Sequence, residues 1–439
     1  MADSLLDTRS RIFDVAAGLL AGLFLATAVV WAAPLIRGGD PALERGDLVI
    51  LSGRDDGVGG QHEKLVNLWN ATIGQAHGIT ARIEALPGSA DDHYSEMKGR
   101  AESAGGTVDI YNLDVIWIAE FAANRWIQPL DESTVDTSGF IRTPLDAGRY
   151  DGRLWALPFN TDAGLLFYRT DLVGTGLPPM RWRDLSRKID EAFDARTEPR
   201  LAAGYVGQLD DYEGLTVNAL EAIWDADGEV VEDGKVVIDR YRQQVETGLA
   251  HLANARAEGE RPLLHPDAVR SREGDCTRAF REGTVAFMRN WPVAYRNLTE
   301  QAAESRARPA FSVTRFGKWS VLGGQSLAIA AGTDQPAAAR SLVEFLTSPL
   351  SGQILFERGG FAATHAVIYK DEKVRQTYPY AEVLLQAVET ARPRPVTPHY
   401  ALFSKTFRTG VRYAMEHNGK LPGGFAEQLA AALDGRLLE

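Results

Sequence analysis

The chain has 439 residues, of which 45% are hydrophobic and 24% are charged, a composition typical of a globular protein large enough for two lobes. A formal net charge of −12 and the lack of any basic block argue against nucleic acid as a partner. The single cysteine, Cys276, excludes an internal disulfide framework and cysteine-rich zinc sites.

The first predicted element is an apolar segment, residues 15–36, which contains no charge and has Arg11 before it and Arg37 after it. At about 1.5 Å per residue, a helix of this length crosses a hydrocarbon core of about 30 Å. We predict a retained signal anchor, with residues 1–14 in the cytoplasm and residues 37–46 as a tether. A cleaved signal peptide is the alternative, and both deliver the rest of the chain to the outside.

Beyond the tether, strands and helices alternate. Hydrophobic runs predict strands at 48–53, 79–88 and 108–114, and helical spacing of apolar residues predicts helices at 61–74 and 91–104. This order is typical of a mostly parallel sheet with crossover helices.

Asp114 stands at the end of the third predicted strand, and a helix is expected directly after it, at 115–126. Ligands of such sheets collect at the carboxyl ends of the strands. We therefore expect the Asp114 carboxylate to cap this helix and also to face a cleft.

The second half of the chain continues the alternation. Predicted elements are an extended segment and strand at 155–172, a helix at 181–193, a hairpin at 223–239, a helix and a strand within 276–298, a strand at 320–333, and helices from about 335 onward. Asp225, Asp227 and Gly228 resemble the start of a calcium loop, but the glutamate of its twelfth position is missing, which favours a hairpin turn.

Five ordered motifs, at 108–130, 155–172, 279–293, 323–371 and 393–404, carry a family resemblance. They include "WALPFNTDAGLLFYRTDL", "AFREGTVAFMRNWPV" and "PRPVTPHYALFS". The chain resembles family 1 extracellular solute-binding proteins of carbohydrate ABC importers, and most closely the actinobacterial trehalose-binding type. The resemblance covers nearly the whole chain beyond the apolar segment.

The resemblance implies an α/β fold of the type II periplasmic-binding-protein (venus-flytrap) kind, in which two lobes joined by a hinge close on a sugar. Lobe 1 would comprise 47–160 and 324–363, and lobe 2 would comprise 161–323 and 364–439. The implied hinge crossings lie near Pro158–Asp162, Val321–Gly324 and Ala362–Thr364.

The resemblance also implies three acidic ligand contacts. Asp114 matches a carboxylate that accepts hydroxyl hydrogens, and Glu273 matches another acidic contact. Asp162 stands where trehalose binders carry Asn, so a group that donates and accepts becomes an acceptor.

Four further contacts are implied. Trp291 matches a stacking aromatic, Gly324 a backbone contact, and Arg394 a guanidinium that reaches the sugar from the C-terminal segment. Gln325 stands where a relative has an apolar side chain. The departures at 162 and 325 bear on which sugar is bound.

These residue types suit a sugar on physical grounds, because charged groups make strong hydrogen bonds to hydroxyls and an indole covers the apolar face of a pyranose. Each residue also has a structural alternative. The same sequence would be found if none of them bound a ligand. Asp114 could serve only as a helix cap and Glu273 as a solvated charge on a helix. Trp291 could belong to the core, and Arg394 could serve only in a salt bridge.

The sequence therefore predicts a monomeric, membrane-anchored extracytoplasmic protein that binds a neutral di- or oligosaccharide, trehalose- or maltose-like, and serves the permease subunits of an ABC importer. No catalytic motif, metal-ligand spacing or cofactor motif occurs, so we expect neither an enzyme nor a cofactor or metal site. Alternatives are a sugar-sensing ectodomain for a signalling partner and a glycoside hydrolase using two of the three acidic residues, about 5 to 10 Å apart.

Overall fold

The computed structural model describes residues 43–103, 107–195, 200–253, 261–300 and 310–436. The chain separates into Met1–Glu44 and a compact unit, Arg45–Glu439. The predicted anchor at 15–36 lies outside the described residues. Within the described ranges, no helix combines the length and apolar character that a membrane crossing requires.

The first sheet of the compact unit has the strand order β2-β1-β3-β13-β6. Its first three strands are parallel, as predicted, and β13 runs antiparallel to β3 and β6. The middle of β1 is an apolar run that is buried on both faces, as expected for a strand covered by helices on each side. The strands are β1 (Gly46–Gly53), β2 (Ile79–Leu86), β3 (Ile110–Asp114), β6 (Leu157–Ala163) and β13 (Leu322–Ile329).

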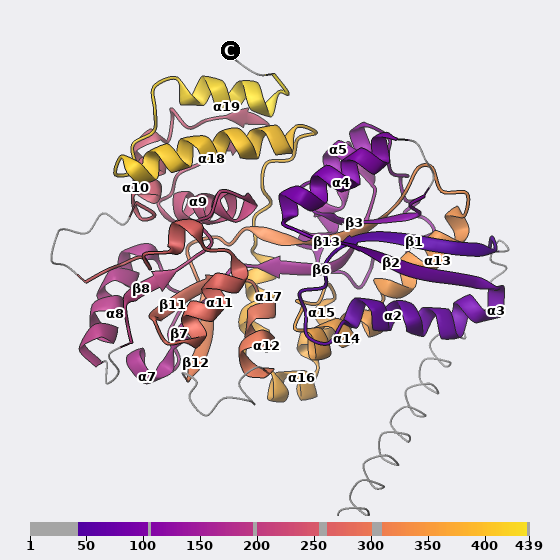
Figure 1. Cartoon of the computed structure of the whole chain (residues 1–439), viewed down its shortest axis with the longest axis horizontal. Helices are drawn as coiled ribbons and strands as arrows, with labels where there is room; N and C mark the ends of the chain where they lie inside the picture. The colour runs from indigo at the N-terminus through magenta and orange to yellow at the C-terminus, as the bar shows by residue number, and fades with distance from the viewer. Residues whose placement is uncertain (1–42, 104–106, 196–199, 254–260, 301–309, 437–439) are drawn as a thin grey trace, which may run out of the picture. The chain divides into compact units, whose positions relative to one another are not determined.

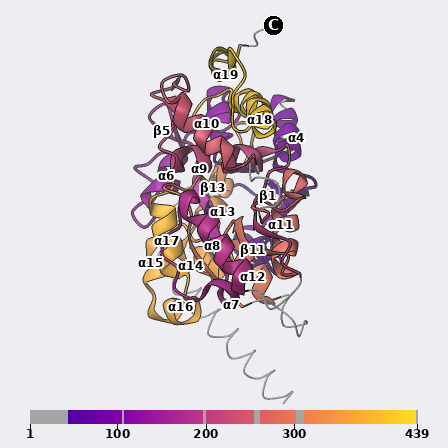
Figure 2. The ribbon, with the colours of Figure 1, turned by 90° about the vertical axis from the view of Figure 1, so that its left-hand side faces the viewer.

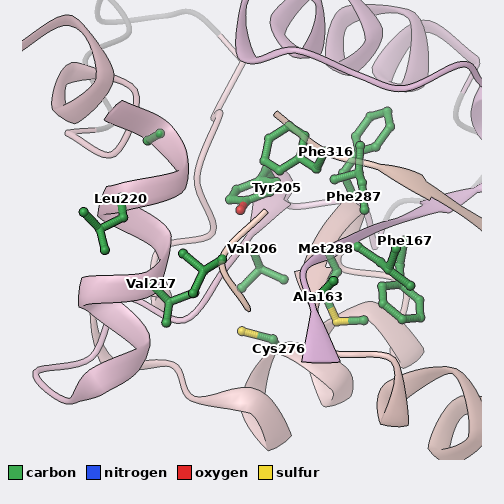
Figure 3. Packing of buried hydrophobic residues seen from close by; sticks show 14 of the residues in the cluster. Ala163, Phe167, Tyr205, Val206, Val217, Leu220, Cys276, Phe287, Met288 and Phe316 are labelled. Atoms are coloured by element: carbon green, nitrogen blue, oxygen red, sulfur yellow. The ribbon is translucent and has the colours of Figure 1, made fainter. Parts of the chain in front are cut away.

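The second sheet has the order β12-β7-β11-β8, with β11 parallel to β8 and antiparallel to β7. Its strands are β7 (Leu165–Arg169), β8 (Ala203–Val206), β11 (Val285–Asn290) and β12 (Phe311–Arg315). Figure 3 shows the packing on this sheet, where Phe167, Val206, Met288 and the buried Cys276 belong to one hydrophobic core. We call the half built on the first sheet lobe 1 and the half built on the second sheet lobe 2 (Figure 1).

Gly164 alone separates β6 of lobe 1 from β7 of lobe 2. A Cβ at this position would lie 2.6 Å from Oε1 of Glu221 and 2.5 Å from Nη2 of Arg289, so a larger residue does not fit. The chain returns to lobe 1 between β12 and β13, and the Thr161 N–H donates to the Ala362 carbonyl at 3.2 Å. The chain thus passes between the two sheets at Gly164 and again between β12 and β13, and the hinge crossings and lobe limits expected from the resemblance remain predictions.

Helices surround both sheets and dominate the C-terminal part, as predicted from residue 335 onward. Figures 1 and 2 both show α18 and α19 stacked beside α9 and α10 in lobe 2. The helices of lobe 1 before the first crossing are α2 (Gln61–Trp69) with η1 (Asn70–Gly74) and α3 (Gln75–His77), α4 (Ala90–Glu102), α5 (Ile118–Ala123) and α6 (Arg142–Ala147).

The remaining elements follow in chain order. They are α7 (Thr170–Val173), α8 (Trp182–Ala195), α9 (Glu213–Asp225), α10 (Arg242–Ala250), η2 (Ala268–Arg270), α11 (Glu273–Arg281), α12 (Val293–Glu300), α13 (Pro336–Leu346), α14 (Pro349–Ile354), η4 (Leu355–Gly359), α15 (Ala366–Lys370), α16 (Glu372–Thr377), α17 (Ala381–Glu389), α18 (Tyr400–Glu416) and α19 (Phe425–Leu433). Two short hairpins complete the fold: β4 (Arg149–Tyr150) with β5 (Arg153–Leu154), and β9 (Val231–Glu232) with β10 (Lys235–Val236).

The predicted hairpin within 223–239 is confirmed by β9 and β10, although α9 extends into this segment as far as Asp225. Asp225 pairs with the Arg181 guanidinium and accepts the backbone N–H of Trp182 at 3.0 Å. The carboxylate that resembled the first ligand of a calcium loop is therefore used to join α8 to α9.

Candidate functional site

A cavity of about 640 Å³ lies between the two lobes. This volume is within the range of about 300 to 1,000 Å³ that is usual for small-molecule sites. All seven residues selected from the sequence line it: Asp114, Asp162, Glu273, Trp291, Gly324, Gln325 and Arg394. The fold thus brings them together from both lobes, and their contacts with a ligand stay predictions.

Asp114 ends β3, but it does not cap a helix. Its Oδ1 accepts the backbone N–H of Ile116 at 3.2 Å, which closes a turn, and α5 begins only at Ile118. The N-cap of α5 is Trp117, without a side-chain hydrogen bond. The predicted helix at 115–126 was too long and the predicted capping role was wrong, because the residues after the strand first form this turn.

The same Oδ1 of Asp114 accepts a hydrogen bond from Nη2 of Arg394 at 3.0 Å. Arg394 lies in the loop before α18, and its Nη1 donates to Oε1 of Glu213 at 2.8 Å. Its side chain is only 2% exposed. Burial raises the pKa of Asp114, while Arg394 acts in the opposite direction. Arg394 therefore serves first as a buried link between Asp114 and Glu213, which is the salt-bridge alternative considered above.

Asp162 lies near the end of β6, next to the first crossing between the lobes. Its Oδ1 is buried and has no hydrogen-bond partner among the described residues. The pKa of Asp162 is raised to about 8, chiefly by burial and also by the charges of Asp114 and Glu273, against the effect of Arg289. A protonated carboxyl offers one donor and one acceptor, so at neutral pH Asp162 resembles an asparagine more closely than a carboxylate.

Trp291 follows β11 and is half-buried. The guanidinium carbon of Arg289 lies 3.9 Å from the centre of its ring, and a Cβ at Gly323 would lie 3.3 Å from the indole. Arg289 is held by two hydrogen bonds to Glu221, at 2.7 and 2.9 Å. The indole is thus fixed between a buried ion pair and a glycine-bearing strand, which is a rigid arrangement for stacking on an apolar surface.

Gly324 has a φ of 111°, and a Cβ here would lie 2.5 Å from the Asn160 carbonyl oxygen. Any side chain would push β13 away from β6. The Gly324 carbonyl accepts the Val115 N–H at 3.2 Å. Gln325 follows, paired with Asp114 and Asn160 in the sheet, and its half-buried side chain lines the cavity.

Glu273 is the first residue of α11 and is half-buried. Its backbone carbonyl accepts from the Asn290 side chain at 3.1 Å, which ties α11 to the end of β11. The neighbouring Arg272 pairs with Asp210 at 2.6 Å. A carboxylate in the first turn is stabilised by the helix dipole. Glu273 therefore stands beside the cavity at the amino end of a helix.

Several cavity residues were missed by sequence reasoning. Glu213 binds Arg394, but nothing in the sequence shows this pairing across 181 positions. His62 lies between the rings of Phe159 and Phe361, at centroid distances of 4.8 and 4.9 Å. Its Nε2 is buried without a partner among the described residues, and burial lowers its pKa, so it is a neutral polar group in the wall of the cavity.

Basic and acidic side chains line the cavity in equal number. Five arginines line it together with five carboxylates. They are Arg54, Arg272, Arg278, Arg281 and Arg394, and Asp56, Asp114, Asp162, Glu213 and Glu273. In the described ranges, no three or more His, Cys, Asp or Glu side chains are grouped as metal ligands would be.

Solved structures with this arrangement define the class of fold. Maltose-bound MalE3 of T. maritima is similar with a TM-score of 0.75 and 27% sequence identity, covering 89% of this chain and 99% of that one. An ABC transporter solute-binding protein of Thermotoga lettingae, bound with α-D-tagatose, is similar with a TM-score of 0.73 and 21% identity, covering 89% and 100%. The predicted two-lobed α/β periplasmic-binding-protein fold is confirmed.

The family is also established. A family model described as "Bacterial extracellular solute-binding protein" matches residues 70–379, more than half of the chain, and the protein belongs to this family. A relative described as "Probable ABC transporter-binding protein" from Deinococcus radiodurans is 27% identical over 372 residues, 81% of this chain and 86% of the relative. The protein is thus an extracytoplasmic solute-binding protein of the ABC type, and its family and structural relatives are binding proteins.

Proposed function

We propose that the protein captures a neutral di- or oligosaccharide, trehalose- or maltose-like, in the cavity between its lobes and delivers it to the permease subunits of an ABC importer. The observation that carries this proposal is the convergence of Asp114, Asp162 and Glu273 with Trp291 on one cavity. Carboxyl groups exchange strong hydrogen bonds with sugar hydroxyls, and the indole covers the C–H face of a ring.

The balance of charge supports a neutral ligand. An anionic ligand such as a sugar phosphate would bring its charge beside Glu273, for which no ion pair with a cationic side chain is found among the described residues. Arg394 is already committed to Asp114 and Glu213, and Arg272 to Asp210. The maltose found in the T. maritima protein, which is 27% identical, favours an α-linked glucoside as the first candidate.

Titration calorimetry on the full-length protein tests the ligand. The panel is trehalose, maltose and maltotriose, with glucose 6-phosphate and free amino acids as charged competitors. The detergent that covers the apolar segment must carry no maltoside headgroup, because that headgroup is itself a candidate ligand. We expect binding of at least one neutral α-glucoside. Binding of only an anionic or peptide ligand would overturn the proposal.

Delivery to an importer is tested by a pull-down from membranes of the native host, with and without the sugar. Recovery of permease subunits supports the proposal, and recovery of a sensor kinase would replace it with the sensing alternative.

We also propose that residues 15–36 are retained as a membrane anchor. The protein should then stay with membranes through high salt and carbonate washes, and its mass should show a chain that begins at Met1 or Ala2. A soluble mature form that begins near residue 33 would refute the anchor and leave export standing.

A further inference from the structure

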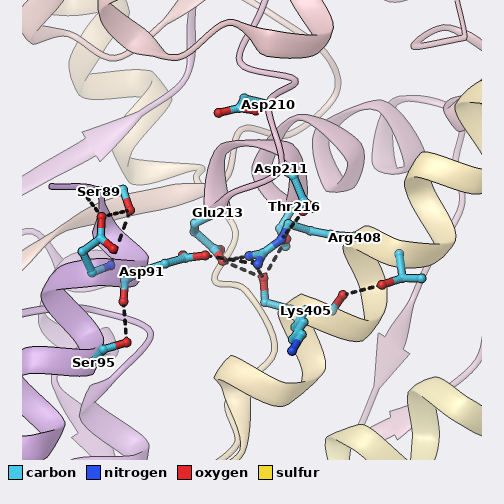
Figure 4. Close-up of polar contacts among 12 residues, drawn as sticks. Ser89, Asp91, Ser95, Asp210, Asp211, Glu213, Thr216, Lys405 and Arg408 are labelled. Carbon is cyan, nitrogen blue, oxygen red and sulfur yellow. Dashed lines mark hydrogen bonds and ion pairs between the residues drawn. The ribbon is translucent and has the colours of Figure 1, made fainter.

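A second ion pair joins the lobes outside the set of predicted ligand contacts. Arg408 on α18 of lobe 2 donates through Nη2 to Oδ2 of Asp91 on α4 of lobe 1, at 3.1 Å. The Arg408 side chain is 10% exposed and the Asp91 side chain is 43% exposed. Figure 4 shows Arg408 extending from its helix toward the carboxylates of Asp91, Asp211 and Glu213.

Arg408 is held in place by its own lobe before it reaches lobe 1. Its Nε donates to Oδ1 of Asp211 at 3.2 Å, and its Nη1 donates to Oγ of Ser404 at 3.3 Å and lies 4.0 Å from Oε2 of Glu213. A guanidinium fixed in this way loses little side-chain entropy when it meets a further carboxylate. Asp91 therefore meets a positioned cation rather than a mobile one.

Glu213 connects this pair to the interior of the cavity. Its Oε2 accepts from Ser404 at 2.7 Å and faces Arg408, while its Oε1 accepts from Arg394 at 2.8 Å and from Tyr400 at 2.6 Å. Arg394 in turn binds Asp114 at the end of β3 in lobe 1. Two connections between the lobes thus share one buried carboxylate.

The position of the pair separates it from ligand contact. Ser89 and Ala90, just before Asp91, line the cavity, and so does Glu213, but neither Asp91 nor Arg408 does. The pair stands beside the cavity wall, where it can hold the lobes together without touching the contents. Arg408 lies 3.1 Å from Asp91 and 4.0 Å from Glu213, so without its charge these two carboxylates would be left to repel each other.

We infer that Arg408 and Asp91 form a latch that holds the two lobes closed and that Glu213 couples this latch to the Arg394–Asp114 connection inside the cavity. Arg408 and Asp91 are positioning residues, which raise the affinity for the sugar by slowing the separation of the lobes. The latch adds to the proposed function a mechanism that retains the bound sugar. Only the measurement of sugar dissociation depends on the proposed function.

The primary variant is Asp91→Asn, which keeps the shape of the side chain and removes its charge. We expect the dissociation rate of the sugar to rise about threefold to tenfold, which is the scale of about 1 kcal/mol for a partly exposed pair, while the association rate changes little. Asp91→Glu, which keeps the carboxylate, should restore slow dissociation. Arg408→Gln should have the larger effect because it leaves opposed carboxylates.

The matched control is Arg412→Gln. Arg412 lies one turn after Arg408 on α18 and pairs with Asp211 of its own lobe at 3.0 Å, so it makes no connection between lobes. Its loss should leave both rate constants unchanged. Rates are measured by stopped-flow tryptophan fluorescence on the full-length protein.

A second measurement does not need a ligand. Spin labels at Asn67→Cys on α2 and Arg183→Cys on α8, both exposed positions, report the distance between the lobes. We expect Asp91→Asn to shift the distance distribution of the ligand-free protein to longer values and Asp91→Glu to leave it unchanged. If no sugar in the panel binds, the proposed function fails while this measurement still tests the latch.

The inference is overturned if Asp91→Asn leaves the distances and the dissociation rate as they are in the unmodified protein. It is equally overturned if Asp91→Asn lowers the melting temperature alone, because Asp91 would then be only an acidic residue in the first turn of α4.

Discussion

Arg289 and Arg408 each bind carboxylates beside the same cavity, yet their surroundings differ sharply. The side chain of Arg289 is 1% exposed and that of its partner Glu221 is 6% exposed. Arg408 is 10% exposed, but its partner across the lobes, Asp91, is 43% exposed. Water can replace the exposed carboxylate of Asp91, but it cannot reach the buried carboxylate of Glu221. Similar chemistry therefore holds the fold in one place and adjusts the closure of the lobes in the other.

The buried pair also belongs to one structural unit. Glu221 on α9 binds Arg289 on β11, and its Oε1 accepts the backbone N–H of Val321 at 3.0 Å, just before the chain returns to lobe 1. Gly164 leaves room for both side chains at the other crossing. The pair therefore fixes the crossings between the lobes and supports the indole of Trp291 from behind.

The largest expected effect comes from Glu221→Gln. This change keeps the volume of the side chain but leaves the Arg289 charge buried without its counter-ion, which typically costs about 3 to 5 kcal/mol in the free energy of unfolding. Chemical denaturation measures it. Glu191→Gln is the control, because Glu191 pairs with Lys188 on an exposed face of α8 and its loss should change the free energy of unfolding far less. Equal losses in the two variants would contradict the role given to burial.

The second prediction separates stacking from core packing. Trp291→Ala should weaken sugar binding roughly tenfold or more, because stacking and burial of an indole contribute on the order of 1 to 3 kcal/mol. Trp126→Ala removes another half-buried indole in lobe 1 that does not line the cavity. It should lower the melting temperature and leave affinity unchanged. If the two variants behave alike, Trp291 belongs to the core and the sugar site lies elsewhere.

Part of this site could be predicted from the sequence, because the ends of strands can be recognised there. The hydrophobic run before Asp114 places this residue at the carboxyl end of a strand, where ligands of such sheets collect. The other six residues were predicted from the family motifs. Convergence of all seven on one cavity follows from the topology that these elements share.

The polar connections could not be predicted in the same way. Glu213 and Arg394 are 181 positions apart, and Asp91 and Arg408 are 317 apart. Periodicity reports which face of a helix is buried, but it does not report which charge on another helix that face meets. The predicted helix after Asp114 began too early for a local reason, since the apolar residues after Asp114 fit a helix, whereas the Asp114 side chain accepts the Ile116 N–H and closes a turn before α5.

A smaller effect concerns pH. The pKa of Asp162 is raised to about 8 by burial, from a usual value of 3.8, so the folded protein binds a proton that the unfolded chain releases. The contribution of Asp162 to the free energy of unfolding is fully present below the pKa that it has in the unfolded chain. This contribution is lost as the pH rises toward 8, with a slope of at most about 1.4 kcal/mol per pH unit. Histidines with a lowered pKa, such as His62, change the stability only below about pH 6.5.

The melting temperature should therefore fall between pH 6.5 and 8 and level off above this range. Asp162→Asn should remove this part of the pH dependence, because the amide does not titrate. Asp91, at the latch, is only partly buried and should leave the profile in this window nearly unchanged when it is replaced by Asn. A slope that persists in Asp162→Asn would show that another group is responsible.

The smallest expected effect concerns the reactivity of the single thiol, which distinguishes the Arg289–Glu221 pair from the Arg408–Asp91 pair. Cys276 on α11 is fully buried in the lobe 2 core, and burial raises the pKa of its thiol well above the usual value. Both conditions make a thiol inert, so a thiol reagent should label it only when lobe 2 opens. Glu221→Gln loosens that core and should speed labelling. Asp91→Asn separates the lobes without opening either of them, so labelling should stay at the rate of the unmodified protein even where the distance between the lobes has grown. Faster labelling in Asp91→Asn would mean that the latch stabilises the fold of lobe 2 itself, and the contrast between a pair that holds the fold and a pair that adjusts closure would then disappear.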